Sequence, residues 1–124
     1  MERVINFGVN DSVGMRATAL TPFLYRERFN RDLASDIANL QKAMKEATGD
    51  KAEQLAAADI RIFLNIAYTM ASQYAKAHGD QELPRDPMEW LDTFDGVFSI
   101  YELCPAMFEL WSESSEQLSH SKKK

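Results

Sequence analysis

The sequence predicts a mainly α-helical fold: a single helical domain around one long central helix, with a short N-terminal β-hairpin. Apolar or small residues recur at helical spacing from Asp59 to His78, which indicates a helix with one buried side. Capping residues divide the remaining chain into shorter helical segments. Two short runs of alternating apolar residues precede them. At 124 residues the chain can bury a core of its own, so we expect one domain.

The hairpin is expected at about residues 3–18. Asn10-Asp11-Ser12 has the composition of a turn, and apolar residues alternate on both sides of it. These residues are Ile5, Phe7, Val9, Val13, Met15 and Ala17. A lone hairpin is marginal in water, so it either packs on the helices or adds to a neighbouring subunit's sheet. Packing on the helices is the preferred expectation.

Two short helices should follow the hairpin. Thr21 is expected to be the N-cap of the first, with Pro22 at the first helical position, where a missing N–H costs nothing. Asp32 should cap the second helix, whose apolar residues keep a helical period until Gly49.

The central helix is expected to start at Lys51 and end at Gly79. Asp50 and Glu53 have the spacing of a capping box. At about 1.5 Å per residue this helix would be roughly 40 Å long, enough for the other elements to pack along it. Its polar side is expected to face solvent and to carry no chemistry. That side consists of Asp59, Arg61, Asn65, Thr69, Gln73 and Lys76.

The last third of the chain should form a surface loop at residues 80–85, then a helix that begins at Asp86-Pro87 and stops near Gly96. Residues 97–113 are apolar and interrupted by Pro105. This pattern predicts two short helices that meet at Cys104-Pro105, or one kinked helix. We therefore expect the domain to cover residues 1–113 and a flexible polar tail, ending in lysines, to cover residues 114–124.

The net charge of −5 is unevenly distributed. Residues 80–116 carry ten acidic residues against Arg85 alone, whereas residues 1–79 carry ten basic and nine acidic residues. Direct binding to nucleic acid is disfavoured, because it depends on a basic face that meets phosphates. The simplest interpretation of the acidic third is a solvated helix face.

No catalytic, cofactor or metal motif is present, so we expect no enzyme. The sequence lacks a glycine-rich phosphate loop, a GxSxG elbow, an HExxH pair and EF-hand spacing. Glu89, Asp92 and Asp95 lie on one expected helix face, but a metal site needs carboxylates from several elements, so they are interpreted as solvated charges. His78 is expected to cap the central helix.

Cys104 is the one cysteine, which excludes an internal disulfide. With only His78 and His120 beside it, the usual Cys/His zinc site is excluded too. Cys104 is expected to be a buried, inert thiol, and a reducing cytoplasm is the expected setting. The N-terminus lacks the pattern of an export signal, and no window has enough apolar residues for a membrane span.

Two groups of residues are candidates for partner binding. Arginines concentrate around the first helix, which is typical either of a solvated helix end or of a docking patch for an acidic surface. Six aromatics fall within 22 residues, which suggests that part of them forms an exposed groove or a subunit contact rather than core. The candidates are Arg26, Arg28, Arg31, Trp90, Phe94, Phe98, Tyr101, Phe108 and Trp111.

The runs ATALTPFLYRERFNRDL, AYTMASQYA and EWLDTFDGVFSIYELCPAMFELW resemble the small tail assembly chaperones of long-tailed bacteriophages and prophages. The similarity covers residues from about 3 to 112 and depends on short ordered signatures, not on catalytic residues. The resemblance implies a mostly helical protein of the host cytoplasm that binds the tape measure protein, keeps it soluble and helps recruit tail tube subunits before leaving. It also implies self-association and absence from the mature virion.

The same resemblance implies a short and a long form related by a ribosomal frameshift. Lys122-Lys123-Lys124 is consistent with a slippery run of adenines and equally with a solubilising tail. The basic first helix and the acidic last third are complementary, which suits head-to-tail stacking that high salt would dissociate.

Two other classes of function stay open. One is an acidic interaction or inhibitor module that mimics nucleic acid and occludes a basic host protein, which requires carboxylates spaced like phosphates on one surface. The other is a small helical hydrolase, which requires a deep pocket joining His78 to several acidic residues.

Overall fold

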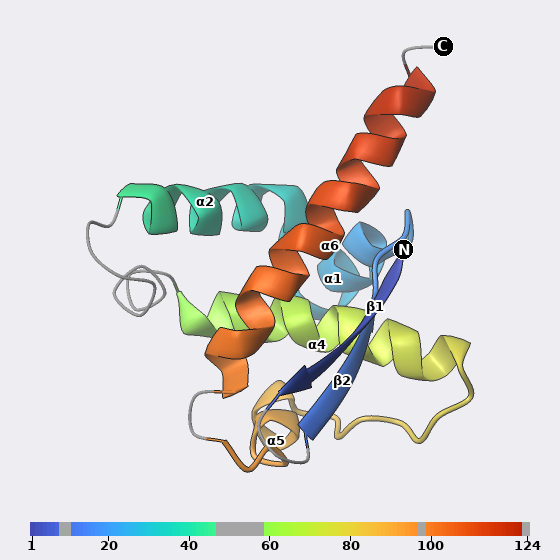
Figure 1. Cartoon of the computed structure of the whole chain (residues 1–124), viewed down its shortest axis with the longest axis vertical. Helices are drawn as coiled ribbons and strands as arrows, with labels where there is room; N and C mark the ends of the chain where they lie inside the picture. Colours follow the sequence, from blue (N-terminus) through green and yellow to red (C-terminus); the bar gives the residue numbers. More distant parts are fainter. Residues whose placement is uncertain (8–10, 47–58, 97–98, 123–124) are drawn as a thin grey trace.

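The computed structural model describes residues 1–7, 11–46, 59–96 and 99–122, with the side chains of Phe7 and of residues 114–122 excepted. Figure 1 shows a hairpin followed by helices, as predicted. The elements are β1 (Glu2–Phe7), β2 (Asp11–Arg16), α1 (Thr21–Phe29), α2 (Leu33–Glu46), α4 (Ile60–Ala77), α5 (Pro87–Leu91) and α6 (Ser99–Lys122). No described helix has the length and apolar character that a bilayer span needs.

The hairpin packs on the helices. β1 and β2 pair antiparallel, from Glu2 opposite Arg16 to Phe7 opposite Asp11. Val13 and Met15 alternate inward along β2 and are buried against α4. Between them, Gly14 lets the Tyr74 ring lie directly on the strand, since a Cβ at this position would meet that ring at 2.3 Å. The prediction of a hairpin packed on the helices is therefore confirmed.

The central helix is α4, which contacts β2, α1, α2, α5 and α6 (Figure 1). The prediction that this helix starts at Lys51 is wrong, because α4 starts at Ile60. Asp59 has an extended backbone, and its carboxylate accepts hydrogen bonds from the N–H groups of Arg61 and Ile62 at 3.0 and 3.3 Å, so Asp59 is the N-cap. The second helix's end at Gly49 and the Asp50/Glu53 capping box lie outside the described residues.

The end of α4 agrees with the prediction. His78 is the C-cap, and Gly79 follows with φ +67°, a conformation that glycine adopts without strain. The N–H of Asp80 donates to the carbonyl of Ala75 at 2.9 Å, and the N–H of Gly79 donates to that of Lys76 at 3.4 Å. These two bonds form a Schellman motif, which satisfies carbonyls that the helix end leaves free.

Helix α5 begins as predicted, with the Asp86 carboxylate accepting from the Met88 N–H at 3.0 Å and Pro87 at the start. It ends at Leu91, five residues before the predicted stop at Gly96. Asp32 also caps as predicted, because its carboxylate accepts from the Ser35 N–H at 2.8 Å.

Helix α6 is one helix that passes through Pro105, so of the two predicted alternatives the single helix is the correct one and the two short helices are wrong. Its buried side continues across the proline at helical spacing, which offsets the cost of about 3 kcal/mol for a proline inside a helix. That side consists of Ile100, Leu103, Cys104, Met107 and Leu110. The helix extends to Lys122, so residues 114–122 of the expected tail are helical in their backbone.

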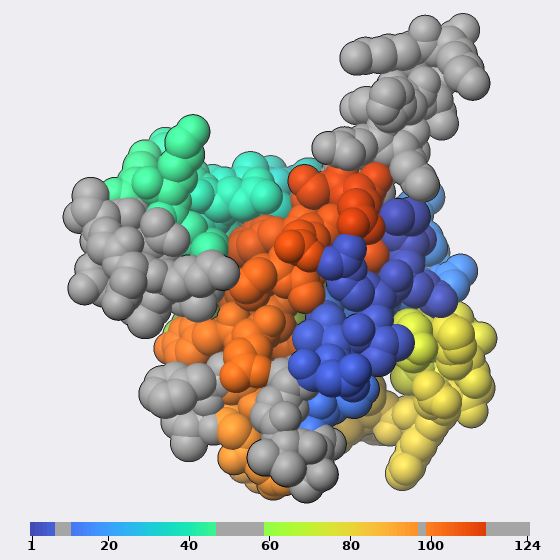
Figure 2. Space-filling view, viewed as in Figure 1, coloured from blue at the N-terminus to red at the C-terminus, as the bar shows by residue number. Residues whose placement is uncertain are grey.

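Figure 2 shows α6 and β1 side by side on one face of the molecule. Arg3 of β1 donates to Glu113 at 2.5 Å and also pairs with Glu109. Two carboxylates of the acidic third are therefore ion-paired within the fold.

Candidate functional site

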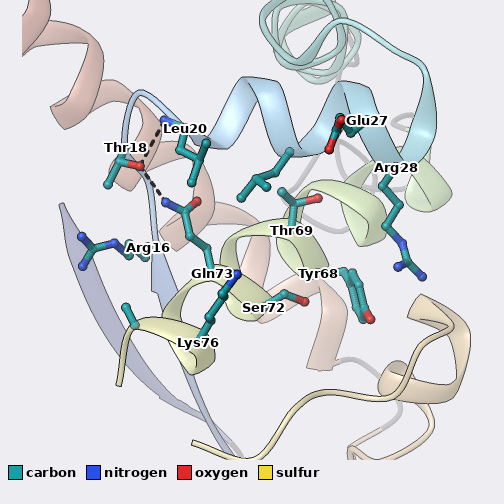
Figure 3. Close-up of a pocket in the computed structure, with 12 residues that line it drawn as sticks. Arg16, Thr18, Leu20, Glu27, Arg28, Tyr68, Thr69, Ser72, Gln73 and Lys76 are labelled. Atoms are coloured by element: carbon teal, nitrogen blue, oxygen red, sulfur yellow. Dashed lines mark hydrogen bonds between the residues drawn. The ribbon is translucent and has the colours of Figure 1, made fainter. Parts of the chain in front are cut away.

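An open groove of about 680 Å³ lies between α1 and α4 (Figure 3). Two rows of α4 side chains form its floor: Tyr68, Ser72 and Lys76 in one row, and Thr69, Gln73 and Ala77 in the other. Helix α1 and the chain before it form the facing wall, which consists of Leu20, Leu24, Glu27 and Arg28. Arg16 and Thr18 border the groove where β2 ends.

A polar network holds the start of α1 against the groove floor. The Gln73 amide donates to the Thr18 hydroxyl and accepts from the Thr21 hydroxyl, both at 2.6 Å (the first drawn in Figure 3). The Thr21 hydroxyl accepts from the Thr18 N–H at 2.9 Å. Thr21 was predicted to be the N-cap of α1, which is wrong by one residue: Leu20 holds that place, and the Thr21 hydroxyl bonds to Thr18 and Gln73 instead.

This network also corrects the prediction that the polar side of α4 is an ordinary solvent-facing surface. Thr69 is 5% exposed and donates to the Asn65 carbonyl at 2.8 Å. Gln73 is half-buried by its bonds to Thr18 and Thr21. Gln73 therefore holds the start of α1 in place, whereas the Thr69 hydroxyl is satisfied within α4.

The far end of α1 is fixed by a buried carboxylate. Asp36 of α2 is 5% exposed and accepts from the Tyr25 hydroxyl at 2.7 Å and from two nitrogens of Arg31 at 2.8 and 2.9 Å. The hydrogen bonds from Arg31 hold the pKa of Asp36 below its usual value. Burial raises the pKa of Tyr25, and the bond to Asp36 adds to that shift. Ionised Asp36 thus joins α1 and α2.

The predicted arginines divide into different environments. Arg31 is bonded to Asp36, and Arg26 is exposed with its guanidinium 3.8 Å from Asp32. Arg28 lines the groove, donates to the carbonyl of Arg85 and lies over the Tyr68 ring at 4.9 Å. Of the three, Arg28 is the one that the structure brings into the groove.

The described aromatic candidates pack on the core. Trp90 is 4% exposed and makes edge contacts with Tyr68 and Phe94. Phe108 makes an edge contact with Phe63 at 5.2 Å. The partly buried members packed against the core are Phe94, Tyr101, Phe108 and Trp111. Phe98 lies outside the described residues.

Trp90 and Phe94 are among the residues that line a second hollow of about 610 Å³. It lies beside β2, the end of α4 and the loop that follows, and Asp80 and Glu82 are among its lining residues. In the part of the chain that the structure describes, no group of three or more histidine, cysteine, aspartate or glutamate side chains has metal-binding geometry. Glu89, Asp92 and Asp95 are exposed, as predicted, but they do not share a helix face, because α5 ends at Leu91.

The two single-residue predictions outside the candidate group can also be placed. Cys104 is 2% exposed, and burial raises the pKa of its thiol to about 12, as expected for an inert buried cysteine. His78 caps α4, stacks on Tyr74 at 4.1 Å and lies 3.0 Å from a Glu2 carboxylate oxygen.

Sequence reasoning missed the exposed apolar residues beside the groove. Leu20 is 50% exposed and Phe23 is 59% exposed. Apolar residues lie on every side of α1, so its periodicity did not show which side faces outward. In the sequence, the spacing of Leu20 and Leu24, one helical turn apart, was the available indication of an apolar surface on this side of α1.

A scan against protein-family models, a search of curated proteins and a search of solved structures each found no match to this chain.

Proposed function

We propose that this chain is a tail assembly chaperone of a long-tailed bacteriophage or prophage. It binds the tape measure protein, keeps it soluble in the host cytoplasm, helps recruit tail tube subunits and leaves before the virion is complete. The class of partner comes from the resemblance of the sequence signatures. The groove between α1 and α4 supplies the surface on which such a partner docks.

The observation that carries the proposal is the apolar edge of this groove. Leu20 and Leu24 line the groove wall and Leu20 is 50% exposed, while Phe23, three residues after Leu20 on α1, is 59% exposed. Exposed apolar side chains beside a groove are typical of surfaces that bind another polypeptide. An exposed phenylalanine also contributes strongly to binding when a partner buries it.

Co-expression of the tape measure protein with this chain tests the proposal. The wild-type chain should keep the tape measure protein in the soluble fraction and co-purify with it. The double variant Leu20→Ser/Phe23→Ser should lose most of that effect while remaining folded, since both residues are exposed. Met88→Ser is the matched control, because Met88 is 49% exposed but lies on α5.

Unchanged solubility of the tape measure protein, with no complex formed, would overturn the proposal. The alternative, an acidic module that mimics nucleic acid, receives less support, because Glu109 and Glu113 are paired with Arg3 rather than presented as a free array. That alternative predicts capture of a basic host protein and indifference to Leu20 and Phe23.

A further inference from the structure

We propose that the groove between α1 and α4 selects an acidic, amphipathic helical segment of its protein partner. An apolar residue of that segment packs on Leu20, Leu24 and Tyr68. Its neighbouring carboxylates meet Lys76, Arg28 and the hydroxyl of Ser72. This inference rests on the proposed function to the extent that the groove binds a partner polypeptide, and it adds the chemistry of the segment that is bound.

The charges that border the groove are mainly positive. Arg28 and Lys76 line it and form no ion pair with any residue that the structure describes. Arg16 also lines it but is paired with Glu2 at 2.6 Å. Glu27 is the acidic residue among the described lining residues. The groove lining thus contains two cations without a carboxylate partner and one carboxylate. This excess of positive charge favours an anionic ligand.

Ser72 supplies an independent indication. Its hydroxyl oxygen is buried and has no hydrogen-bond partner among the described residues. By contrast, Thr69 on the same helix donates to the carbonyl one turn back. A buried hydroxyl without a partner is unfavourable and uncommon, and a ligand can satisfy it once the side chains that cover the oxygen move aside. Figure 3 shows Ser72 on the floor of the groove, between Lys76 and Tyr68.

The apolar part of the groove fits a protein side chain. Leu20, Leu24, Tyr68 and Ala77 line a hollow of about 680 Å³, which is large enough for side chains but too small for a folded partner. A groove between two helices commonly accepts the ridge of a third helix. Phe23 is not among the lining residues, but it lies about one turn from Leu20 and Glu27 on α1 and is 59% exposed.

The rest of the chain reinforces the selection. Residues 80–116 carry ten acidic residues against Arg85, so an acidic segment is repelled from that part of the surface. The same negative charge would attract a basic segment to the acidic third instead. Charge therefore directs an acidic segment to the groove and fixes where on the protein it binds.

Two synthetic peptides of about 15 residues test the inference, a length at which an isolated helix becomes possible. Both carry leucines at helical spacing; one has glutamates and the other lysines at the same flanking positions. The full-length chain should bind the glutamate peptide about tenfold more tightly by fluorescence anisotropy. That preference should weaken near 1 M salt, where the screening length falls to about 3 Å. Amide NMR shifts should change in residues 18–28 and 68–77.

Four variants assign the chemistry. Lys76→Glu should weaken binding of the glutamate peptide about tenfold, whereas Lys42→Glu, the same change on exposed α2, should leave it unchanged. Glu27→Gln should strengthen it two- to fivefold, since it removes the acidic group of the wall. Ser72→Ala should weaken it about threefold without lowering stability, because the hydroxyl that it removes has no partner in the free protein.

Equal binding of the two peptides, no binding of either, or shift changes confined to the second hollow would each overturn the inference. Sedimentation that shows self-association abolished by Lys76→Glu would overturn it as well, because a second copy would then occupy the groove. The outcome is separable from that of the proposed function. If Lys76→Glu still keeps the tape measure protein soluble, the chaperone proposal stands and the acidic-segment inference fails. If the chain binds the glutamate peptide selectively but has no effect on the solubility of the tape measure protein, the acidic-segment inference stands and the chaperone proposal fails.

Discussion

The side of α4 that faces β2, α5 and α6 is packed with apolar side chains, whereas the side that faces α1 carries hydroxyl, amide and amine groups. On the first side Phe63, Ile66 and Met70 are at most 1% exposed. On the second, Gln73 bonds to Thr18 and Thr21 beside an open groove. The same helix therefore forms a closed core on one side and a partly open, polar contact on the other.

The difference teaches that aromatic density and exposure are separate properties. The aromatic segment 90–111 packs on the closed side, and its described members are buried or half-buried. Among the phenylalanines whose side chains the structure describes, the exposed one is Phe23 on α1, in a segment that the sequence singled out for its arginines. A partner surface is thus better sought at the polar side of α4, where packing is incomplete.

The largest expected difference in stability is between variants of two aromatic residues, Trp90 and Phe23. Trp90→Ala removes a buried side chain from the closed side and should lower the free energy of unfolding by about 3–5 kcal/mol. Phe23→Ala removes an exposed one and should change it by less than about 0.5 kcal/mol. Urea denaturation at neutral pH measures both. Similar values for the two variants would break the comparison.

The next effect concerns the carboxylate that joins α1 to α2. Asp36→Asn weakens the bonds from Tyr25 and Arg31 and should lower the free energy of unfolding by about 1–3 kcal/mol at pH 7. Asp32→Asn, at an exposed position, should have the smaller effect. A loss for Asp36→Asn below that of Asp32→Asn would show that the buried bonds do not hold α1.

The same site predicts a pH dependence. The pKa of Asp36 is lower in the folded chain than its ordinary value, so its contribution to stability is present above about pH 4 and is lost as the pH falls through the folded pKa. The stability difference between wild type and Asp36→Asn should therefore shrink between pH 5 and about pH 2. Urea titrations across this range measure it; a constant difference would contradict the assignment.

A smaller effect is expected where Gln73 holds the start of α1. Gln73→Leu removes the bonds to Thr18 and Thr21 and should lower the free energy of unfolding by about 1–2 kcal/mol. Amide exchange should accelerate in α1 more than in α6. Gln41→Leu makes the same change at an exposed position of α2 and serves as the control. Equal exchange in α1 for the two variants would refute the role of the network.

The smallest expected change in stability is at Gly79, which follows the C-terminal end of α4. Gly79 has φ +67°, so Gly79→Ala should cost about 1 kcal/mol through backbone strain. Gly79→Asn should cost less, since asparagine tolerates the left-handed conformation. Thermal denaturation ranks the two variants, and equal midpoints would argue against strain at this position.

The sequence predicted the features that depend on local chemistry. Alternation in the hairpin, the caps Asp32 and Asp86 and the stop at Gly79 each depend on a few neighbouring residues, and the structure contains all of them. The start of α4 was missed because Asp59 and Asp50 are both good caps, and the backbone at Asp59 decides between them. The sequence left open whether α6 is one helix or two, because burial on both sides of Pro105 decides this and outweighs the local effect of proline.

The groove was not predictable in the same way. Its lining residues come from β2, α1 and α4 and from positions between them, so their meeting depends on how α1 docks. That docking depends on bonds between residues that are distant in the sequence, such as Thr18 with Gln73 and Tyr25 with Asp36. The exposure of Phe23 follows from the same docking, which periodicity along α1 does not encode.

The central claim is that a partner binds at the groove between α1 and α4 and not at the aromatic segment. Amide hydrogen exchange of the chain, alone and in complex with the tape measure protein, tests it most directly. The account predicts slower exchange in residues 18–28 and 68–77 on complex formation. Protection confined to residues 86–111, with α1 unchanged, would contradict it.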